Sequence, residues 1–181
     1  VGMTRASIGV QDFDPLIQKA IGREQSYTLT RDVAERIRDR GVASLNADIL
    51  YGLPFQTGPR ISDSVQKLLT LSPDRVALYG YAHVPWMKRH QRMIDTADLA
   101  DPWQRWCQAK AAGRVFEAAG YRAVGLDHFA RPGDPLVQAL AAGSGRPASG
   151  SSNCGQSVSG SGSKFPLPPA LPPAEQMVVA V

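Results

Sequence analysis

Four short apolar segments recur along this chain at nearly even spacing, and a helix-like stretch separates each one from the next. The segments cover residues 6–11, 45–50, 75–81 and 121–126. They end near Gln11, Asp48, Ala82 and Asp127, about 35 to 45 residues apart. Connections of this length, built around a helix, join parallel strands of one sheet. The sequence therefore predicts an α/β fold with about four βα units.

The connections carry helix signals. Apolar residues at helical spacing predict helices over residues 15–21, 30–40, 61–71 and 102–119. Thr30 is the expected N-cap of the second helix, and Gly41 follows its end. Pro73 ends the third helix, and Gly120 follows the fourth.

Alternation within the apolar segments distinguishes two kinds of parallel sheet. One face of the first segment holds Ser7, Gly9 and Gln11, and one face of the second holds Asn46 and Asp48. A doubly wound sheet is covered by helices on both sides, so both of its faces would be apolar. A barrel-like sheet fits better, with the polar face lining a lumen that holds a ligand. The alternative is that these polar residues merely end strands in solvent.

The composition changes sharply after Gly143. Half of residues 144–181 are Ser, Pro or Gly, and their only charged side chains are Arg146, Lys164 and Glu175. Such a segment has too little apolar surface to offset the entropy lost on ordering. We therefore predict a working domain over residues 1–143 and a disordered C-terminal tail over residues 144–181.

Charge and cysteine content exclude several classes of protein. The net charge of +4 comes from scattered basic residues, which is compatible with an anionic substrate and favours no nucleic-acid partner. Cys107 and Cys154 form neither a disulfide framework nor a CxxC metal motif. We find no apolar run long enough to span a membrane and no signal peptide. The expectation is a cytoplasmic protein with no membrane partner.

Three polar residues near the predicted strand ends are candidates for ligand binding. Asp48 is the strongest, because aspartate is rare in strands and this one is flanked by apolar residues. It could equally be a structural aspartate that accepts hydrogen bonds from a neighbouring loop. Gln11 offers a donor and an acceptor at a strand end. Arg23 can bind a carboxylate, although on residue type alone a salt bridge with Glu24 or a solvated surface position is the more ordinary role.

The histidines do not indicate a metal site. His83, His90 and His128 lack the short spacing that places two ligands on one helix face. His128 follows Asp127 at the last predicted strand end, and such a pair can transfer protons. A histidine fixed by loop hydrogen bonds is the alternative. The basic run at residues 88–92 is interpreted as a solvated surface.

Four longer strings carry a family resemblance. They are GVQDFDPLIQKAIGREQ at residues 9–25, NADILYGLPFQT at 46–57, SPDRVALYGYAHVPWMKRHQR at 72–92 and GYRAVGLDHFARPGDPL at 120–136. Together they closely resemble the oxygen-independent coproporphyrinogen III oxidases, also called coproporphyrinogen dehydrogenases, of the radical S-adenosylmethionine superfamily. GVQ and YGLP are shared by wider relatives, whereas YAHVP and DHFARP are more specific. The resemblance runs from about residue 2 to 143.

The resemblance implies a partial (β/α)₆ barrel with a [4Fe–4S] cluster and two S-adenosylmethionine molecules at its mouth. It implies the oxidative decarboxylation of two propionates of coproporphyrinogen III to vinyl groups, giving protoporphyrinogen IX in porphyrin biosynthesis. The positions that match the family's second S-adenosylmethionine site are Gln11, Arg23, Asp48 and Ala82. Arg23 would pair with a ligand carboxylate, Asp48 would accept from amino or hydroxyl groups, and Ala82 would offer backbone contacts. The implied partners are the substrate and an electron donor, and the implied state is a monomer.

The sequence also departs from the family. Residues 1–181 contain no CxxxCxxC cluster motif, and neither cysteine can replace it. The family's glycine-rich segment and acidic residue for the first S-adenosylmethionine are also missing, and the match stops near Gly143. The sequence therefore predicts a central fragment that is inactive alone, from a truncation, a frameshift or a gene-prediction artefact. The alternative is a haem-chaperone relative that binds haem without catalysis.

Overall fold

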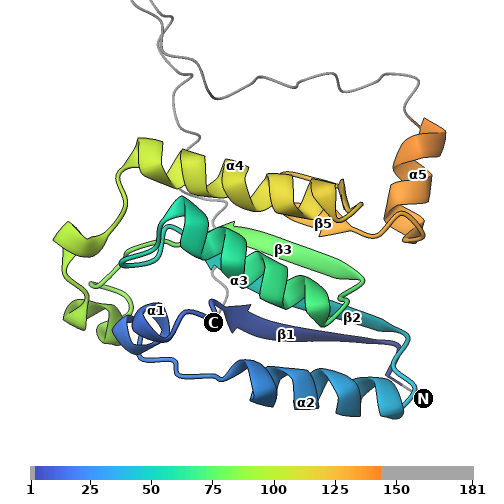
Figure 1. Cartoon of the computed structure of the whole chain (residues 1–181), viewed down its shortest axis with the longest axis horizontal. Helices are drawn as coiled ribbons and strands as arrows, with labels where there is room; N and C mark the ends of the chain where they lie inside the picture. The colour runs from blue at the N-terminus through green and yellow to red at the C-terminus, as the bar shows by residue number, and fades with distance from the viewer. Residues whose placement is uncertain (1–2, 144–181) are drawn as a thin grey trace, which may run out of the picture. The chain divides into compact units, whose positions relative to one another are not determined.

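Three parallel strands form the body of a five-stranded sheet, and a short hairpin extends one side of it (Figure 1). The computed structural model describes residues 3–143. The strands are β1 (Arg5–Gln11), β2 (Ser44–Tyr51), β3 (Arg75–Gly80), β4 (Arg122–Ala123) and β5 (His128–Ala130). Their order across the sheet is β1-β2-β3-β5-β4. The predicted α/β class is confirmed; the predicted tail lies outside the described residues.

The predicted helices form with shifts of a few residues at their ends. The helices are α1 (Pro15–Ala20), α2 (Tyr27–Asp39), α3 (Gly58–Thr70), α4 (Pro102–Ala118) and α5 (Pro135–Gly143), with 3₁₀ turns η1 (Arg89–Met93) and η2 (Thr96–Asp98). The N-cap predicted for α2 is wrong. Ser26 caps this helix by accepting from the Leu29 N–H, and the Thr30 hydroxyl donates to the Ser26 carbonyl one turn inside.

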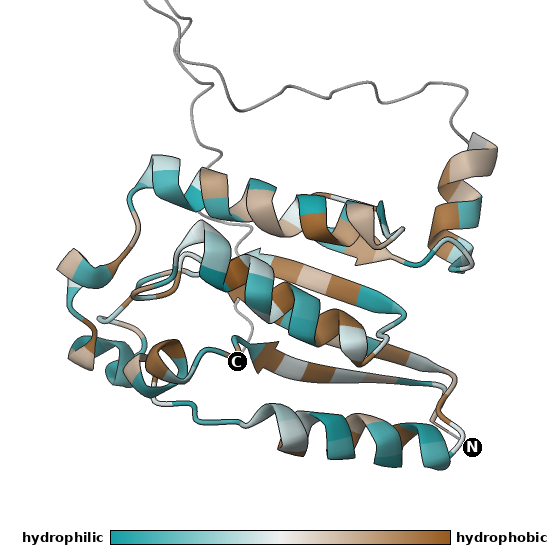
Figure 2. Ribbon diagram, viewed as in Figure 1, coloured by the Kyte–Doolittle hydropathy of each residue, from teal (hydrophilic) through white to brown (hydrophobic). Residues whose placement is uncertain are grey.

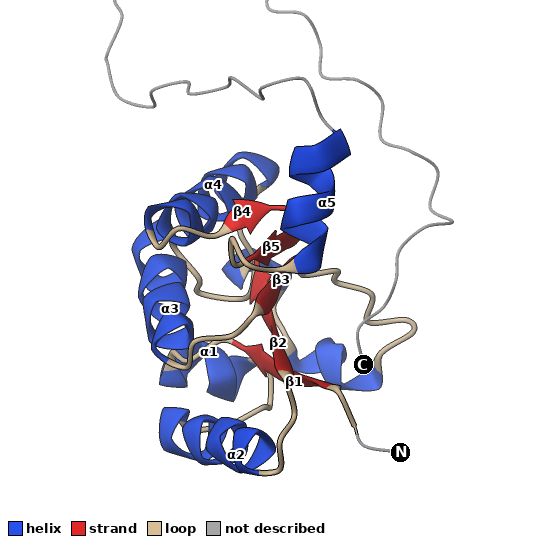
Figure 3. Ribbon diagram, turned by 90° about the vertical axis from the view of Figure 1, so that its right-hand side faces the viewer, coloured by secondary structure: helices blue, strands red, loops and turns tan. Residues whose placement is uncertain are grey.

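The two faces of the sheet differ as the alternation predicts. Helices α2, α3 and α4 lie on one side of it (Figure 3). Apolar residues alternate with hydrophilic ones along α3, as an amphipathic helix requires (Figure 2). The core on this side is formed by strand and helix residues, among them Val10, Ala47, Ile49, Val65, Leu68, Val76, Leu78 and Phe116. Ser7, Asn46 and Asp48 instead line a cavity on the opposite, inner face.

The fourth predicted strand is the main correction to the fold. Residues 121–126 do not add a parallel strand beside β3. Only Arg122–Ala123 is a strand, and β5 lies between it and β3, antiparallel to both. The chain reverses because the Val124 N–H donates to the His128 carbonyl (2.9 Å) and the Leu78 N–H donates to the Asp127 carbonyl (2.7 Å). The sheet thus contains three parallel strands and a hairpin.

A buried carboxylate joins the end of β1 to α3 and to the turn after β2. Asp12 is fully buried. Its Oδ1 accepts from the Ser64 hydroxyl (2.6 Å) and the Asp14 N–H (2.7 Å), and its Oδ2 accepts from Gln56 Nε2 (2.7 Å). Burial raises the pKa of Asp12, although these hydrogen bonds oppose the shift. The carboxylate therefore has a partner for each oxygen, which makes its burial tolerable.

The same cluster extends to α4 through two glutamines. Gln56 Oε1 accepts from the Gly52 N–H (2.7 Å), and Gln108 Oε1 accepts from the same N–H (2.8 Å). Gln108 Nε2 donates to the Gln56 carbonyl (2.7 Å). These hydrogen bonds fix the loops at the C-terminal ends of β1 and β2 to helices α3 and α4. The alternation along the strands places the candidate ligand residues near the same strand ends.

Replacing Asp12 by alanine should destabilise the fold by about 2–3 kcal/mol, because the donors of Ser64 and Gln56 would stay buried without an acceptor. Urea denaturation followed by circular dichroism measures the change. The control is Asp63→Ala on the exposed side of α3, where a side chain paired only with Lys67 contributes little. Equal losses in both variants would contradict the role given to Asp12.

Candidate functional site

Two of the predicted site residues meet at Gly9 on the inner face of β1. The Arg23 Nη2 donates to the Gly9 carbonyl at 2.8 Å. A Cβ atom added at Gly9 would lie 2.8 Å from Gln11 Nε2 and 3.3 Å from Arg23 Nη2. The amide of Gln11 and the guanidinium of Arg23 therefore share the space that a side chain at position 9 would fill. Glu24, the alternative partner weighed for Arg23, forms no ion pair with it in the part of the chain that the structure describes.

The backbone at Gln11 explains how its side chain reaches that space. Gln11 has a φ of 67°, in the left-handed region that residues other than glycine rarely adopt. The register between β1 and β2 shifts between Gly9 and Gln11. Such bulges redirect a side chain and are common beside functional sites. The local strain is thus located at a residue predicted to bind a ligand.

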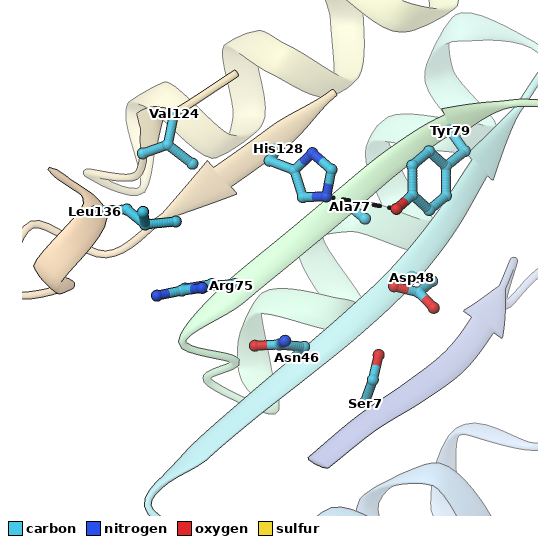
Figure 4. Close-up of a pocket in the computed structure, with 9 residues that line it drawn as sticks. All are labelled: Ser7, Asn46, Asp48, Arg75, Ala77, Tyr79, Val124, His128 and Leu136. Carbon is cyan, nitrogen blue, oxygen red and sulfur yellow. Dashed lines mark hydrogen bonds between the residues drawn. The ribbon is translucent and has the colours of Figure 1, made fainter. Parts of the chain in front are cut away.

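Asp48 lies opposite Gly9 in the register of β1 and β2. It lines a cavity of about 490 Å³ on the inner face of the sheet (Figure 4). Burial raises the pKa of Asp48, while the charge of His128 and a hydrogen bond from Ser7 pull it down. The structure therefore places Asp48 next to the Gly9 cluster, with a partly desolvated carboxylate that can accept from a ligand.

The cavity contains residues that sequence reasoning did not assign to the site. Its lining is Ser7, Asn46, Asp48, Arg75, Ala77, Tyr79, Val124, His128 and Leu136. Asn46 Oδ1 is buried and has no hydrogen-bond partner among residues 3–143, so it offers an acceptor to a ligand. Arg75 is held by Asp134 through two hydrogen bonds of 2.6 and 2.9 Å, which lower the pKa of Asp134. Side chains alternate between the two faces along β3, and this alternation places Tyr79 on the inner face. The same alternation is the sequence signal that could have identified Tyr79 as a residue of the cavity.

Ala82 is the fourth candidate ligand residue. It follows the end of β3 in a loop, where its carbonyl accepts from Gln91 Nε2 (3.0 Å). Gln91 Oε1 also accepts from the Val84 N–H (2.5 Å), so one buried side chain fixes this loop. No hydrogen bond within residues 3–143 joins Ala82 to Gln11, Arg23 or Asp48. Its assignment to the ligand site stays a prediction.

The described residues hold no cradle for a metal cluster. Within residues 3–143, no three or more His, Cys, Asp or Glu side chains gather as metal ligands would, and Cys107 is a single free cysteine. The ligands of a [4Fe–4S] cluster are thiolates, so these residues do not fit that group. Across the same residues, no helix is both long and apolar enough to span a bilayer.

Comparison with known proteins defines the class and then the family. No family model matches the chain. The structure is similar to coproporphyrinogen III oxidase (HemN) from Escherichia coli, a radical SAM enzyme, with a TM-score of 0.75 and 37% identity over 78% of this chain and 33% of that one. The fold is therefore that of part of a radical S-adenosylmethionine enzyme.

The sequence comparison is more specific. The chain is 63% identical over 142 residues to the oxygen-independent coproporphyrinogen III oxidase of Paracoccus denitrificans, and 61% identical to that of Cereibacter sphaeroides. The match covers 78% of this chain and 32% of each relative. The chain belongs to the oxygen-independent coproporphyrinogen III oxidase family and spans about a third of the length of these curated relatives. Nothing in the comparisons supports the haem-chaperone alternative.

Replacing Gly9 by alanine should weaken binding of S-adenosylmethionine, the ligand that the family resemblance implies for Gln11 and Arg23, by roughly tenfold or more, because the new methyl group would displace the ends of these two side chains. These ends are flexible, so the fold should survive. Calorimetric titration measures the affinity. Gly125→Ala is the matched control, since a Cβ there meets nothing within 4 Å. Unchanged affinity in Gly9→Ala would contradict a ligand site at this position.

Proposed function

We propose that this chain forms the wall that binds S-adenosylmethionine in an oxygen-independent coproporphyrinogen III oxidase. The observation that carries the proposal is the convergence of Gln11 and Arg23 on Gly9, with Asp48 opposite Gly9 in the next strand. A guanidinium, an amide and a carboxylate around a position without a side chain form a cradle for a small zwitterion. S-adenosylmethionine carries an α-carboxylate, an ammonium, a sulfonium and ribose hydroxyls, so its groups complement this set.

Each residue has a separate role in this proposal. The Arg23 guanidinium has five N–H donors, and those not bound to the Gly9 carbonyl donate to the ligand carboxylate. Asp48 accepts from the ammonium or a ribose hydroxyl. Gln11 donates and accepts through one amide. Ala82 offers backbone contacts from the loop that Gln91 fixes.

The names of the relatives contain coproporphyrinogen III. The reaction proposed for the whole enzyme is the oxidative decarboxylation of two propionates of this compound. When bound and reduced by one electron, S-adenosylmethionine would supply the carbon radical that takes a hydrogen atom from a propionate. Gln11, Arg23, Asp48 and Ala82 of this chain would bind and orient the second S-adenosylmethionine that the family resemblance implies. The described residues do not supply the cluster ligands. We also propose that the whole enzyme receives electrons from a donor, and that it is a monomer in the cytoplasm.

Replacing Asp48 by asparagine should reduce the affinity for S-adenosylmethionine by about tenfold to a hundredfold, because a charge-assisted hydrogen bond contributes roughly 1.5–3 kcal/mol. Calorimetric titration at pH 8 measures the difference. Asp63→Asn makes the same chemical change at an exposed site on α3 and should bind normally. If Asp48→Asn binds as tightly as the unaltered chain, the proposed site is wrong.

The chain alone should not assemble a stoichiometric [4Fe–4S] cluster. Two cysteines in the sequence provide too few thiolates for the family's three-cysteine motif. Iron and sulfide analysis after anaerobic reconstitution measures the cluster content, and the Paracoccus relative treated in the same way is the positive control. Four irons and four sulfides for each copy of this chain would overturn the expectation that it is inactive alone.

A further inference from the structure

The YAHVP string at residues 81–85 forms the loop that leaves β3, and the proposed site uses only the backbone of its second residue. Its first residue, Tyr81, is buried in an apolar cluster with Ile17 on α1 and Leu53 in the turn after β2. The Tyr81 N–H also donates to the Tyr51 carbonyl at the end of β2 (2.8 Å). The segments that follow β1, β2 and β3 therefore meet at one edge of the sheet, where the candidate ligand residues lie.

His83, the third residue of the string, is fixed by hydrogen bonds on both sides. Gln91 Nε2 donates to the Ala82 carbonyl (3.0 Å), and Gln91 Oε1 accepts from the Val84 N–H (2.5 Å). His83 Nδ1 lies 3.3 Å from the Tyr81 hydroxyl, and the two rings lie 6.1 Å apart between centroids. Both the backbone and the ring of this partly exposed histidine are thus held in place.

The burial of Tyr81 decides which of these two atoms donates. Tyr81 is only 7% exposed, and burial raises the pKa of its hydroxyl, which therefore keeps its proton. Among residues 3–143, His83 Nδ1 is the one hydrogen-bond partner of this hydroxyl. A buried O–H group without an acceptor is costly, so the hydroxyl donates to Nδ1. The neutral imidazole then carries its proton on Nε2.

We propose that His83 binds a ligand carboxylate at this edge of the sheet by donating its Nε2–H. The carboxylate belongs to one of the two ligands of the proposed function, on which this inference rests. S-adenosylmethionine carries an α-carboxylate, and coproporphyrinogen III carries propionates. Within the described part of the chain, no hydrogen bond or ion pair reaches His83 Nε2, so the donor is available to either ligand.

The charges of the same loop favour an anionic ligand. Residues 82–94 contain Lys88, Arg89 and Arg92 and no acidic residue. None of these three basic side chains forms an ion pair with any residue from 3 to 143. Arg92 Nε donates to the Pro85 carbonyl (3.3 Å), which holds a positive charge close to the end of the YAHVP string. A local excess of positive charge attracts a carboxylate to the His83 donor.

The first test needs no ligand. Nitrogen-15 NMR of the histidine rings, recorded on the full chain at pH 8, distinguishes the two neutral tautomers. His83 should be the Nε2–H tautomer, and its Nδ1 resonance should shift in Tyr81→Phe, because that variant lacks the hydroxyl that donates to Nδ1. The exposed His90 is the internal control and should give the same resonances in both proteins. An Nδ1–H tautomer at His83, or an unchanged Nδ1 resonance in Tyr81→Phe, would overturn the inference.

The second test identifies the carboxylate. The probes, both at pH 8, are S-adenosylmethionine, titrated calorimetrically, and coproporphyrin III, the stable oxidised form of the porphyrinogen, titrated by absorbance. His83→Leu should weaken binding of at least one probe by about tenfold, because a hydrogen bond to a charged group is lost. His83→Gln keeps an N–H donor and should restore most of that affinity. His90→Leu, the same change at an exposed histidine of η1, should bind both probes normally.

The two probes separate this inference from the proposed function. If S-adenosylmethionine binds the unaltered chain and His83→Leu binds both probes as tightly, the inference alone is overturned. If the unaltered chain does not bind S-adenosylmethionine but binds coproporphyrin III through His83, the proposed function fails and the inference stands. If it binds neither probe, both fail. Urea denaturation of each variant checks that a lost affinity is not a lost fold.

Discussion

The buried carboxylate of Asp12 joins the end of β1 to helix α3 and, through Gln56 and Gln108, to helix α4. A charged group without solvent contact is tolerable only when its oxygens are hydrogen-bonded. Those bonds come from Ser64 on α3 and from Gln56 in the turn after β2. Gln56 is bonded in turn to Gln108 on α4. One carboxylate therefore fixes the ends of two neighbouring parallel strands, and Gln11 precedes it immediately in the chain.

This anchoring explains how an open sheet can present an ordered polar face. The outer face packs on helices through aliphatic and aromatic residues, so the inner face is free to carry Gly9, Asp48 and His128 in one row. Gly9 provides space, and Asp48 provides an acceptor. The strained backbone at Gln11 adjoins Asp12, where the hydrogen-bonded loop can sustain it.

Sequence patterns predicted the parts of this fold that depend on local chemistry. The period of two in β1 and β2 identified the inner face correctly, because each strand has one helix-covered side. The pairing of β5 was not predictable, since the three residues of β5 carry no strand pattern and depend on contacts with β3. Thr30 was wrongly predicted as an N-cap because Ser26, one turn earlier, has the same capping chemistry. Tyr79 and His128 form a pair only through tertiary structure; the sequence indicated His128, just past a predicted strand end, but not Tyr79.

We propose that the inner face around Gly9 binds S-adenosylmethionine. A titration of the full chain with this ligand, followed through its backbone amide resonances by heteronuclear NMR, tests this proposal. We expect saturable shifts at Gly9, Gln11, Asp48 and the loop that begins at Ala82, with smaller shifts on the outer helices. Saturable shifts confined to the outer surface of α2 or α4, with the inner face unchanged, would contradict it.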